Sequence, residues 1–374
     1  MIRKLTIMVA AFILSFSGCT QKNQETENQH QNSQLYMNLP DGYNTPDGMA
    51  MAPDGNLILS VPNFNNQYLM EKGEIEKPSP PFMAVIDKDD NIHHWYDYKK
   101  EDMHPVTGKV GPMDAAFGPD GNLYVADMQV FYDDQHQSRL IRINVENGKP
   151  TSMDVVVTGF IASNGVFWEN NTIFVTESVL QKKQDTLISG VYAFELSELT
   201  GRDKPVQLTP FTDNTADEHL VVSFSSDNHM GFGADGVTFD DDGYLYTTVI
   251  EKSKIYRSKL NEKNKAVETE LFAENKNMVA PDGLIFNKKR QKFYVADFLN
   301  NAVHRIDKDG TVTTLQKNND VTGERGMLDQ PAEVIIRDNN LIIVNMDMAW
   351  ASEGLSVNTQ VDGKYNLAVI DLNK

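Results

Sequence analysis

Residues 235–246 read Asp-Gly-Val-Thr-Phe-Asp-Asp-Asp-Gly-Tyr-Leu-Tyr. The stretch joins a carboxylate and a glycine to a short apolar run, a tight turn and a second apolar run. Related stretches begin at six positions spaced by 47 to 71 residues: Asp47, Asp114, Asn164, Asp235, Asp282 and Glu333. A repeat of about this length indicates one supersecondary unit stacked on its neighbours. Six units of four short strands predict an all-β fold, a six-bladed β-propeller.

The two ends of the chain are predicted to meet in one blade. Residues 366–372 look like a third strand with no fourth strand after them, and residues 35–39 could supply the missing one. An N-terminal strand that closes the last blade would remove an exposed sheet edge.

The N-terminus has the features of an export signal. Arg3 and Lys4 precede an apolar run that is too short to span a bilayer. The run ends at Cys19, the only cysteine, in a context similar to a bacterial lipobox. We therefore predict a lipoprotein signal peptide over 1–18, a lipidated Cys19 with a flexible polar tether over 19–34, and one propeller domain over 35–374. An ordinary signal peptide with an incidental thiol is the alternative.

This organisation predicts a place in the bacterial cell envelope, lipid-anchored outside the cytoplasm on the periplasmic or outer-surface face. The formal net charge of −19 argues against nucleic acid as a partner, because an acidic surface repels phosphates. The predicted partners are the membrane, through the lipid, and a small-molecule substrate.

The opening residues of the six units should converge on the propeller axis. Five acids and one amide in one channel repel one another, and a divalent cation is the simplest remedy. Because the candidate ligands are all oxygens, Ca²⁺ is favoured ahead of Zn²⁺, with Mg²⁺ or Mn²⁺ as alternatives. The competing interpretation is that these residues only cap hairpins or bind channel water.

Long loops are expected on the face where these residues begin their strands. They are residues 62–81, 97–113, 212–234 and 345–365. His229 lies on one of them and is a candidate proton shuttle, and His104 and His219 are expected on the same face. Five methionines are also expected there, where they could line an apolar pocket or pack between blades: Met113, Met128, Met230, Met346 and Met348.

The sequence resembles the senescence-marker-protein, gluconolactonase and luciferin-regenerating-enzyme family. The resemblance is sharpest at residues 163–168, Ser-Asn-Gly-Val-Phe-Trp, at 281–284, Pro-Asp-Gly-Leu, and at 293–297. It implies a six-bladed propeller that holds a catalytic cation, often calcium, and hydrolyses lactones or related esters. By blade order it implies four cation ligands, Asp47, Asn164, Asp235 and Asp282, where the family commonly has Glu, Asn, Asn and Asp. Asp282 matches the family's proposed base, and Asp114 and Glu333 would be further polar groups of the site.

These residues lead to a hypothesis of metal-assisted hydrolysis of a lactone or ester, often sugar-derived, by water. The candidate catalytic residues are Asp282, Asp114 and His229. No Gly-x-Ser-x-Gly or His-Glu-x-x-His motif is present, so serine-esterase and zinc-protease chemistry lack their signatures. Two alternatives stay open: a non-catalytic propeller that binds a glycan or protein, and a lyase or hydratase acting on an oxidised sugar at the same metal site.

Overall fold

The computed structural model describes residues 32–349, 356–357, 361 and 364–373. The predicted signal peptide, Cys19 and most of the predicted tether lie outside these residues. Within the described part of the chain, no helix is long and apolar enough to cross a membrane.

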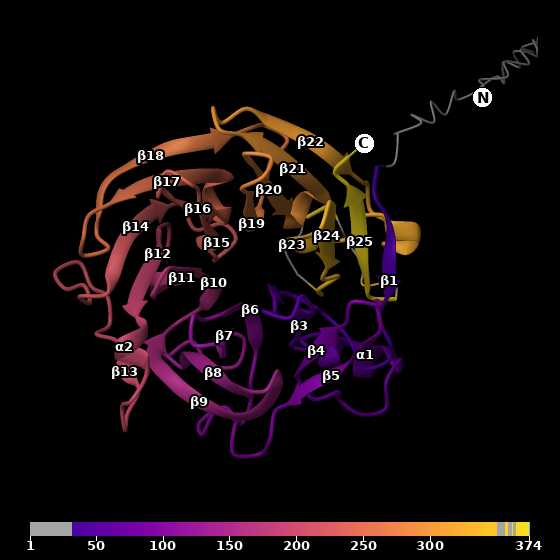
Figure 1. The fold of residues 1–374 in the computed structure, drawn as a ribbon, viewed down its shortest axis with the longest axis horizontal. Helices are drawn as coiled ribbons and strands as arrows, with labels where there is room; N and C mark the ends of the chain where they lie inside the picture. The colour runs from indigo at the N-terminus through magenta and orange to yellow at the C-terminus, as the bar shows by residue number, and fades with distance from the viewer. Residues whose placement is uncertain (1–31, 350–355, 358–360, 362–363, 374) are drawn as a thin grey trace, which may run out of the picture. The chain divides into compact units, whose positions relative to one another are not determined.

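The unit from Gln31 to Lys374 is a six-bladed β-propeller, which confirms the predicted fold class. Figure 1 looks down its axis, with β6, β10, β15, β19 and β23 nearest the centre. The first three blades contain β2 (Met49–Met51), β3 (Leu57–Val61), β4 (Phe82–Ile86) and β5 (Ile92–Asp97), then β6 (Pro112–Phe117), β7 (Leu123–Asp127), β8 (Ser138–Glu146) and β9 (Lys149–Phe160), then β10 (Ser163–Glu169), β11 (Thr172–Lys182), β12 (Leu187–Glu195) and β14 (Leu220–Ser226).

The last three blades complete the ring. They contain β15 (Ala234–Phe239), β16 (Leu245–Val249), β17 (Lys254–Leu260) and β18 (Ala266–Glu274), then β19 (Pro281–Asn287), β20 (Lys292–Asp297), β21 (Ala302–Asp307) and β22 (Val312–Lys317), then β23 (Pro331–Arg337), β24 (Asn340–Asn345), β25 (Asn366–Asp371) and β1 (Gln34–Asn38). In the sixth blade β1 pairs antiparallel with β25, so the N-terminal strand closes the blade as the sequence predicts.

Blade 3 keeps the regular order of four strands but has a long connection between the third and the fourth. Its third and fourth strands are separated by residues 196–219, which hold α2 (Leu196–Leu199) and β13 (Val206–Gln207). β13 pairs in parallel with β9 and makes blade 2 five-stranded. The prediction that residues 212–234 form one loop is therefore wrong, because they include β14, the fourth strand of blade 3.

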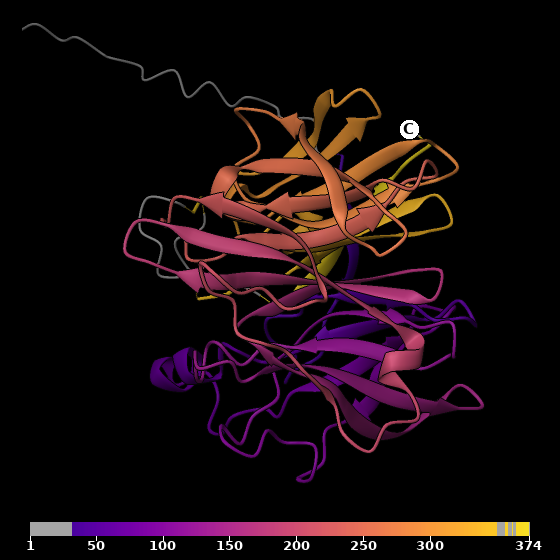
Figure 2. The same cartoon turned by 90° about the vertical axis from the view of Figure 1, so that its left-hand side faces the viewer.

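The connection formed by residues 196–219 also determines where one of the candidate histidines lies. His219 directly precedes β14, and its carbonyl accepts from the Ala193 N–H near the end of β12. That end of blade 3 is opposite to the end where Asn164 lies. Figure 2 shows α2 on the face opposite to α1 (Asn66–Lys72). The prediction that His219 shares a face with the long loops is therefore wrong.

Each blade fixes the segment before its inner strand by one recurring device. A side chain in the second strand or just after its end accepts a hydrogen bond from a backbone N–H of that segment. The acceptor is Asn63, Asp127, Glu177, Glu251, Asp297 or Asn345, with the donor nitrogen 2.6 to 3.1 Å away. Buried backbone donors need such partners, so these side chains hold the six segments that lead into the channel.

Candidate functional site

Five of the six repeat-opening residues lie where the inner strands break their regular pairing, whereas Asp47 lies just before the regularly paired β2. Register shifts occur in the pairs that β6, β10, β15, β19 and β23 make with their second strands, at or next to Asp114, Asn164, Asp235, Asp282 and Glu333. A bulge redirects a side chain from the normal alternation of a strand. The local irregularity therefore frees these side chains from the blade core and turns them toward neighbouring blades.

The glycine that follows four of these residues is required by close packing between blades. A Cβ at Gly48 would lie 2.3 Å from Asp114 Cα, and a Cβ at Gly165 would lie 2.4 Å from the Asp235 carbonyl oxygen. A Cβ at Gly236 would lie 2.3 Å from the Asp282 carbonyl oxygen. No ordinary side chain fits at these distances, so the repeated Asp-Gly and Asn-Gly pairs let adjacent inner strands touch.

Four of the six residues line one small cavity in the channel. Asp47, Asn164, Asp235 and Asp282 are its polar lining residues, and its volume is about 50 Å³. A water molecule needs roughly 10–15 Å³ measured in this way. The cavity is therefore large enough for an ion with water. A larger groove of about 840 Å³ lies between blades 1 and 2, but the six repeat-opening residues do not line it.

The other two repeat-opening residues, Asp114 and Glu333, accept hydrogen bonds from backbone N–H groups of the inner strands. Both carboxylate oxygens of Asp114 accept backbone N–H groups, from Ala115 and from Val166 of the next blade, each at 2.7 Å. Glu333 accepts from the Val334 N–H at 2.7 Å. The bond from Val166 joins the inner strands of blades 2 and 3, and the bonds from Ala115 and Val334 fix each carboxylate against its own strand.

The carboxyl groups of the cavity resist ionisation. Burial raises the pKa of Asp282 well above its ordinary value, and the charge of Asp235 adds to the effect. Burial raises the pKa of Asp235 to about 6, against a hydrogen bond from Asp282 that lowers it. Burial and the charge of Asp235 also raise the pKa of Asp47. Burial and mutual repulsion therefore favour a proton held between Asp282 and Asp235, and such a proton would offset part of the repulsion.

The donor chemistry of this cavity suits a hard cation. Its polar atoms are carboxylate and amide oxygens, which Ca²⁺ and Mg²⁺ prefer. Asn164 donates from Nδ2 to Asp235 Oδ2 at 2.5 Å, and this leaves its carbonyl oxygen for a ligand. Across the described residues, no three His, Cys, Asp or Glu side chains already surround one ion position. Cation binding would therefore require the side chains of Asp47, Asp235 and Asp282 to rearrange around the ion.

The remaining candidates lie apart from this cavity. The His229 side chain is 67% exposed and its ring faces Asp227 at 3.7 Å. His104 accepts from the Val106 N–H in the loop before β6, and burial lowers its pKa. Neither histidine lines the cavity. The roles of these residues, and of the four cavity residues as cation ligands, stay predictions.

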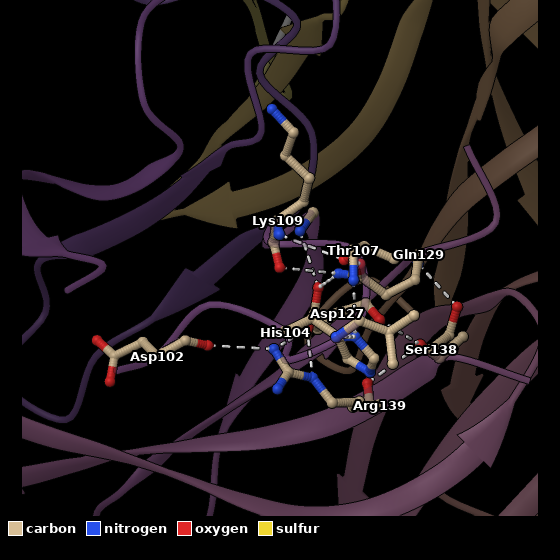
Figure 3. Close-up of polar contacts among 11 residues, drawn as sticks. Asp102, His104, Thr107, Lys109, Asp127, Gln129, Ser138 and Arg139 are labelled. Carbon is tan, nitrogen blue, oxygen red and sulfur yellow. Dashed lines mark hydrogen bonds and ion pairs between the residues drawn. The ribbon is translucent and has the colours of Figure 1, made fainter. Parts of the chain in front are cut away.

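One supporting network was missed by the sequence analysis. Figure 3 shows Arg139 and Asp127 as a buried ion pair, with Gln129 and Thr107 beside them. The Asp127 carboxylate also accepts from the Gly111 N–H at 2.8 Å. The next residue, Met128, lines the cavity. The recurrence of an acid or amide at or near the end of second strands could have indicated this position. Among the described residues, its basic partner recurs only as His304 beside Asp297 at 3.0 Å, which is a different residue type.

The fold and cavity define a six-bladed propeller with an oxygen-lined channel, and comparison with known proteins places it in a family. Residues 82–269, half of the chain, match the SMP-30/gluconolactonase/LRE-like region. The chain belongs to this family. Comparison with curated proteins gives no significant match.

Solved structures agree on the fold. A gluconolactonase from Xanthomonas campestris is 11% identical with a TM-score of 0.54, covering 92% of this chain and 95% of that chain. A luciferin-regenerating enzyme is 9% identical with a TM-score of 0.56, covering 90% and 94%. The PQQ-bound aldose sugar dehydrogenase of Streptomyces coelicolor is 13% identical with a TM-score of 0.52, covering 90% and 97%. Identities this low show a shared fold alone, since one fold carries many activities.

Proposed function

We propose that the protein is a hydrolase of a lactone or related ester that works with a divalent cation, Ca²⁺ ahead of other ions. Membership of the gluconolactonase-like family favours a lactonase or a related sugar-processing activity. The observation that carries the proposal is the meeting of Asp47, Asn164, Asp235 and Asp282 from four blades in one cavity. These four residues would hold the cation.

A bound cation would polarise the substrate carbonyl and stabilise the negative charge that develops on its oxygen. The protein's own part is to move a proton. With the cation bound, the carboxylate of Asp282 or Asp235 takes a proton from the attacking water. Asp114 accepts hydrogen bonds from two backbone amides and so holds the inner strands of blades 2 and 3 in position beside the cavity.

The test is hydrolysis of aldonolactones and aliphatic lactones by the full-length protein, followed by proton release. We expect turnover that a chelator removes and Ca²⁺ restores. Asp282→Asn should lower kcat by about 10²- to 10⁴-fold, because proton transfer is lost. Asp134→Asn changes an exposed aspartate and serves as the matched control. If no lactone is hydrolysed while Ca²⁺ still raises Tm, the reaction is wrong and the binding or lyase alternatives take its place.

We also propose that Cys19 carries a lipid that anchors the protein in the cell envelope. The support is the sequence of the N-terminus alone. Metabolic labelling with a radioactive fatty acid should mark the wild-type protein and leave Cys19→Ala unlabelled. Equal labelling of both proteins would contradict the anchor.

A further inference from the structure

The cavity wall beyond the four polar residues is wholly apolar among the described residues. Ten side chains form it: Met113, Met128, Phe131, Met230, Phe232, Ile250, Phe298, Leu299, Met346 and Met348. Three of the methionines are nearly or fully buried, with 6%, 1% and 4% exposure at Met113, Met128 and Met346. No lysine, arginine, serine or threonine is among the described lining residues.

The apolar wall reaches the surface at an aromatic cluster. Phe131 lines the cavity and is 38% exposed, which is unusual for so large an apolar side chain. Its ring lies 4.9 Å from the Phe64 ring and 5.8 Å from the Phe232 ring. Tyr132 beside it is 39% exposed. An exposed apolar surface that continues into a cavity is typical of a ligand-binding entrance.

This lining discriminates between classes of lactone. A sugar lactone carries several hydroxyl groups, and those that lie against methionine and phenylalanine would lose their water without gaining a partner. An anionic substituent on the apolar wall would be buried without a cationic side chain among the described lining residues. An uncharged lactone with an alkyl or aromatic substituent would bury that substituent against the apolar wall and place its polar carbonyl beside the four polar lining residues.

We infer that the substrate is an uncharged lactone with an apolar substituent, which lies among the methionines and phenylalanines while its carbonyl faces Asp47, Asn164, Asp235 and Asp282. The inference rests on the proposed lactonase function. The cavity of about 50 Å³ is too small for such a molecule, since small-molecule pockets occupy about 300 Å³ or more. Methionine side chains have three rotatable bonds and adapt to a ligand. Because five methionines line the cavity, their side chains can rearrange and enlarge it around a ligand.

The test compares kcat/KM of the full-length protein for γ-butyrolactone, γ-hexalactone, γ-decalactone and D-glucono-δ-lactone. We expect a rise of about fourfold for each methylene that becomes fully buried, with the sugar lactone the poorest substrate. Phe131→Asn should reduce kcat/KM for γ-decalactone about tenfold more than for γ-butyrolactone. Leu271→Asn is the matched control, because Leu271 is 42% exposed on the outer strand β18.

A binding measurement separates this inference from the proposed reaction. Alkyl-substituted lactams have the same ring and tail but resist hydrolysis, and their effect on Tm reports binding alone. If longer tails raise Tm more while no lactone is hydrolysed, the pocket assignment stands and the reaction is wrong. If D-glucono-δ-lactone is hydrolysed best and tail length has no effect, the reaction stands and the apolar substrate class is overturned. If neither hydrolysis nor tail-dependent binding occurs, both are overturned.

Discussion

Asn164 donates a hydrogen bond from Nδ2 to Oδ2 of Asp235 at 2.5 Å, although 71 residues separate the two. The contact joins the inner strands of blades 3 and 4 at the floor of the cavity. It depends on Gly165, whose missing side chain lets the Asp235 backbone approach. The position of a cavity oxygen is therefore set by packing between blades as well as by its own strand.

Gly165→Ala should disturb the cavity and the fold together. Its Cβ would lie 2.4 Å from the Asp235 carbonyl oxygen, so the backbone of one blade must move. Overpacking of this kind costs about 1–3 kcal/mol of the free energy of unfolding. We expect Ca²⁺ affinity to fall as well, because Asp235 is displaced. Chemical denaturation and calorimetric Ca²⁺ titration measure the two effects.

Gly148→Ala is the control for this prediction. Gly148 has φ 75° in a hairpin turn, and a Cβ there would meet no atom within 4 Å. The alanine costs about 1–2 kcal/mol through its left-handed backbone alone, and Ca²⁺ affinity should stay unchanged. Equal Ca²⁺ affinity in Gly165→Ala and wild type would show that packing does not set the cavity.

Arg139→Met should be strongly destabilising. Arg139 and Asp127 are almost fully buried, so removing the cation leaves an uncompensated carboxylate inside blade 2. Losing one member of such a pair costs about 3–5 kcal/mol. Arg142→Met, three residues along the same strand, breaks a pair with Asp154, which is 50% exposed. That loss should stay below about 1 kcal/mol. Similar unfolding free energies for the two variants would contradict the assignment.

Glu177 should make stability depend on pH. Burial raises the pKa of its carboxyl from 4.5 to about 8, against three backbone N–H donors that lower it. The folded state then holds a proton that the unfolded state releases, so the stability this group contributes is full below pH 4.5 and is lost as pH rises through about 8.

The glutamine in Glu177→Gln cannot ionise, so the free energy of unfolding of this variant should fall less than that of wild type between pH 5 and pH 9. The difference between the two proteins should be largest above about pH 8. Denaturant unfolding of both proteins across this range is the measurement. Parallel curves for the two proteins would place the pKa of Glu177 near its ordinary value and refute the prediction.

The repeat made the ring predictable from the sequence. Each inner strand begins at the same point of its blade, so residues such as Asp47 and Asp282, far apart along the chain, have to meet at the axis. The carboxylate or amide followed by glycine marks that point because it serves two needs, a polar side chain in the channel and close contact between blades. The closing strand was predictable for a similar reason, since Gln34–Asn38 fills the only place left in the last blade.

Features that do not recur in every blade could not be predicted from the repeat. The excursion before β14 hid the fourth strand of blade 3 and misplaced His219, because β13 pairs outside its own blade. The basic partners of the second-strand acids, Arg139 beside Asp127 and His304 beside Asp297, differ in residue type and spacing, so no pattern reveals them. The apolar wall was predictable in part, since the five methionines expected on this face all line the cavity, but only the folded chain shows that Phe131 and Phe232 join them.

The central claim is that Asp47, Asn164, Asp235 and Asp282 hold a divalent cation, and calorimetric titration of Ca²⁺ into the chelator-treated full-length protein tests it most directly. The account predicts one ion for each chain, with affinity at least about tenfold weaker in Asp282→Asn and unchanged in Asp134→Asn. Absence of binding, or equal affinity in Asp282→Asn and wild type, would contradict it.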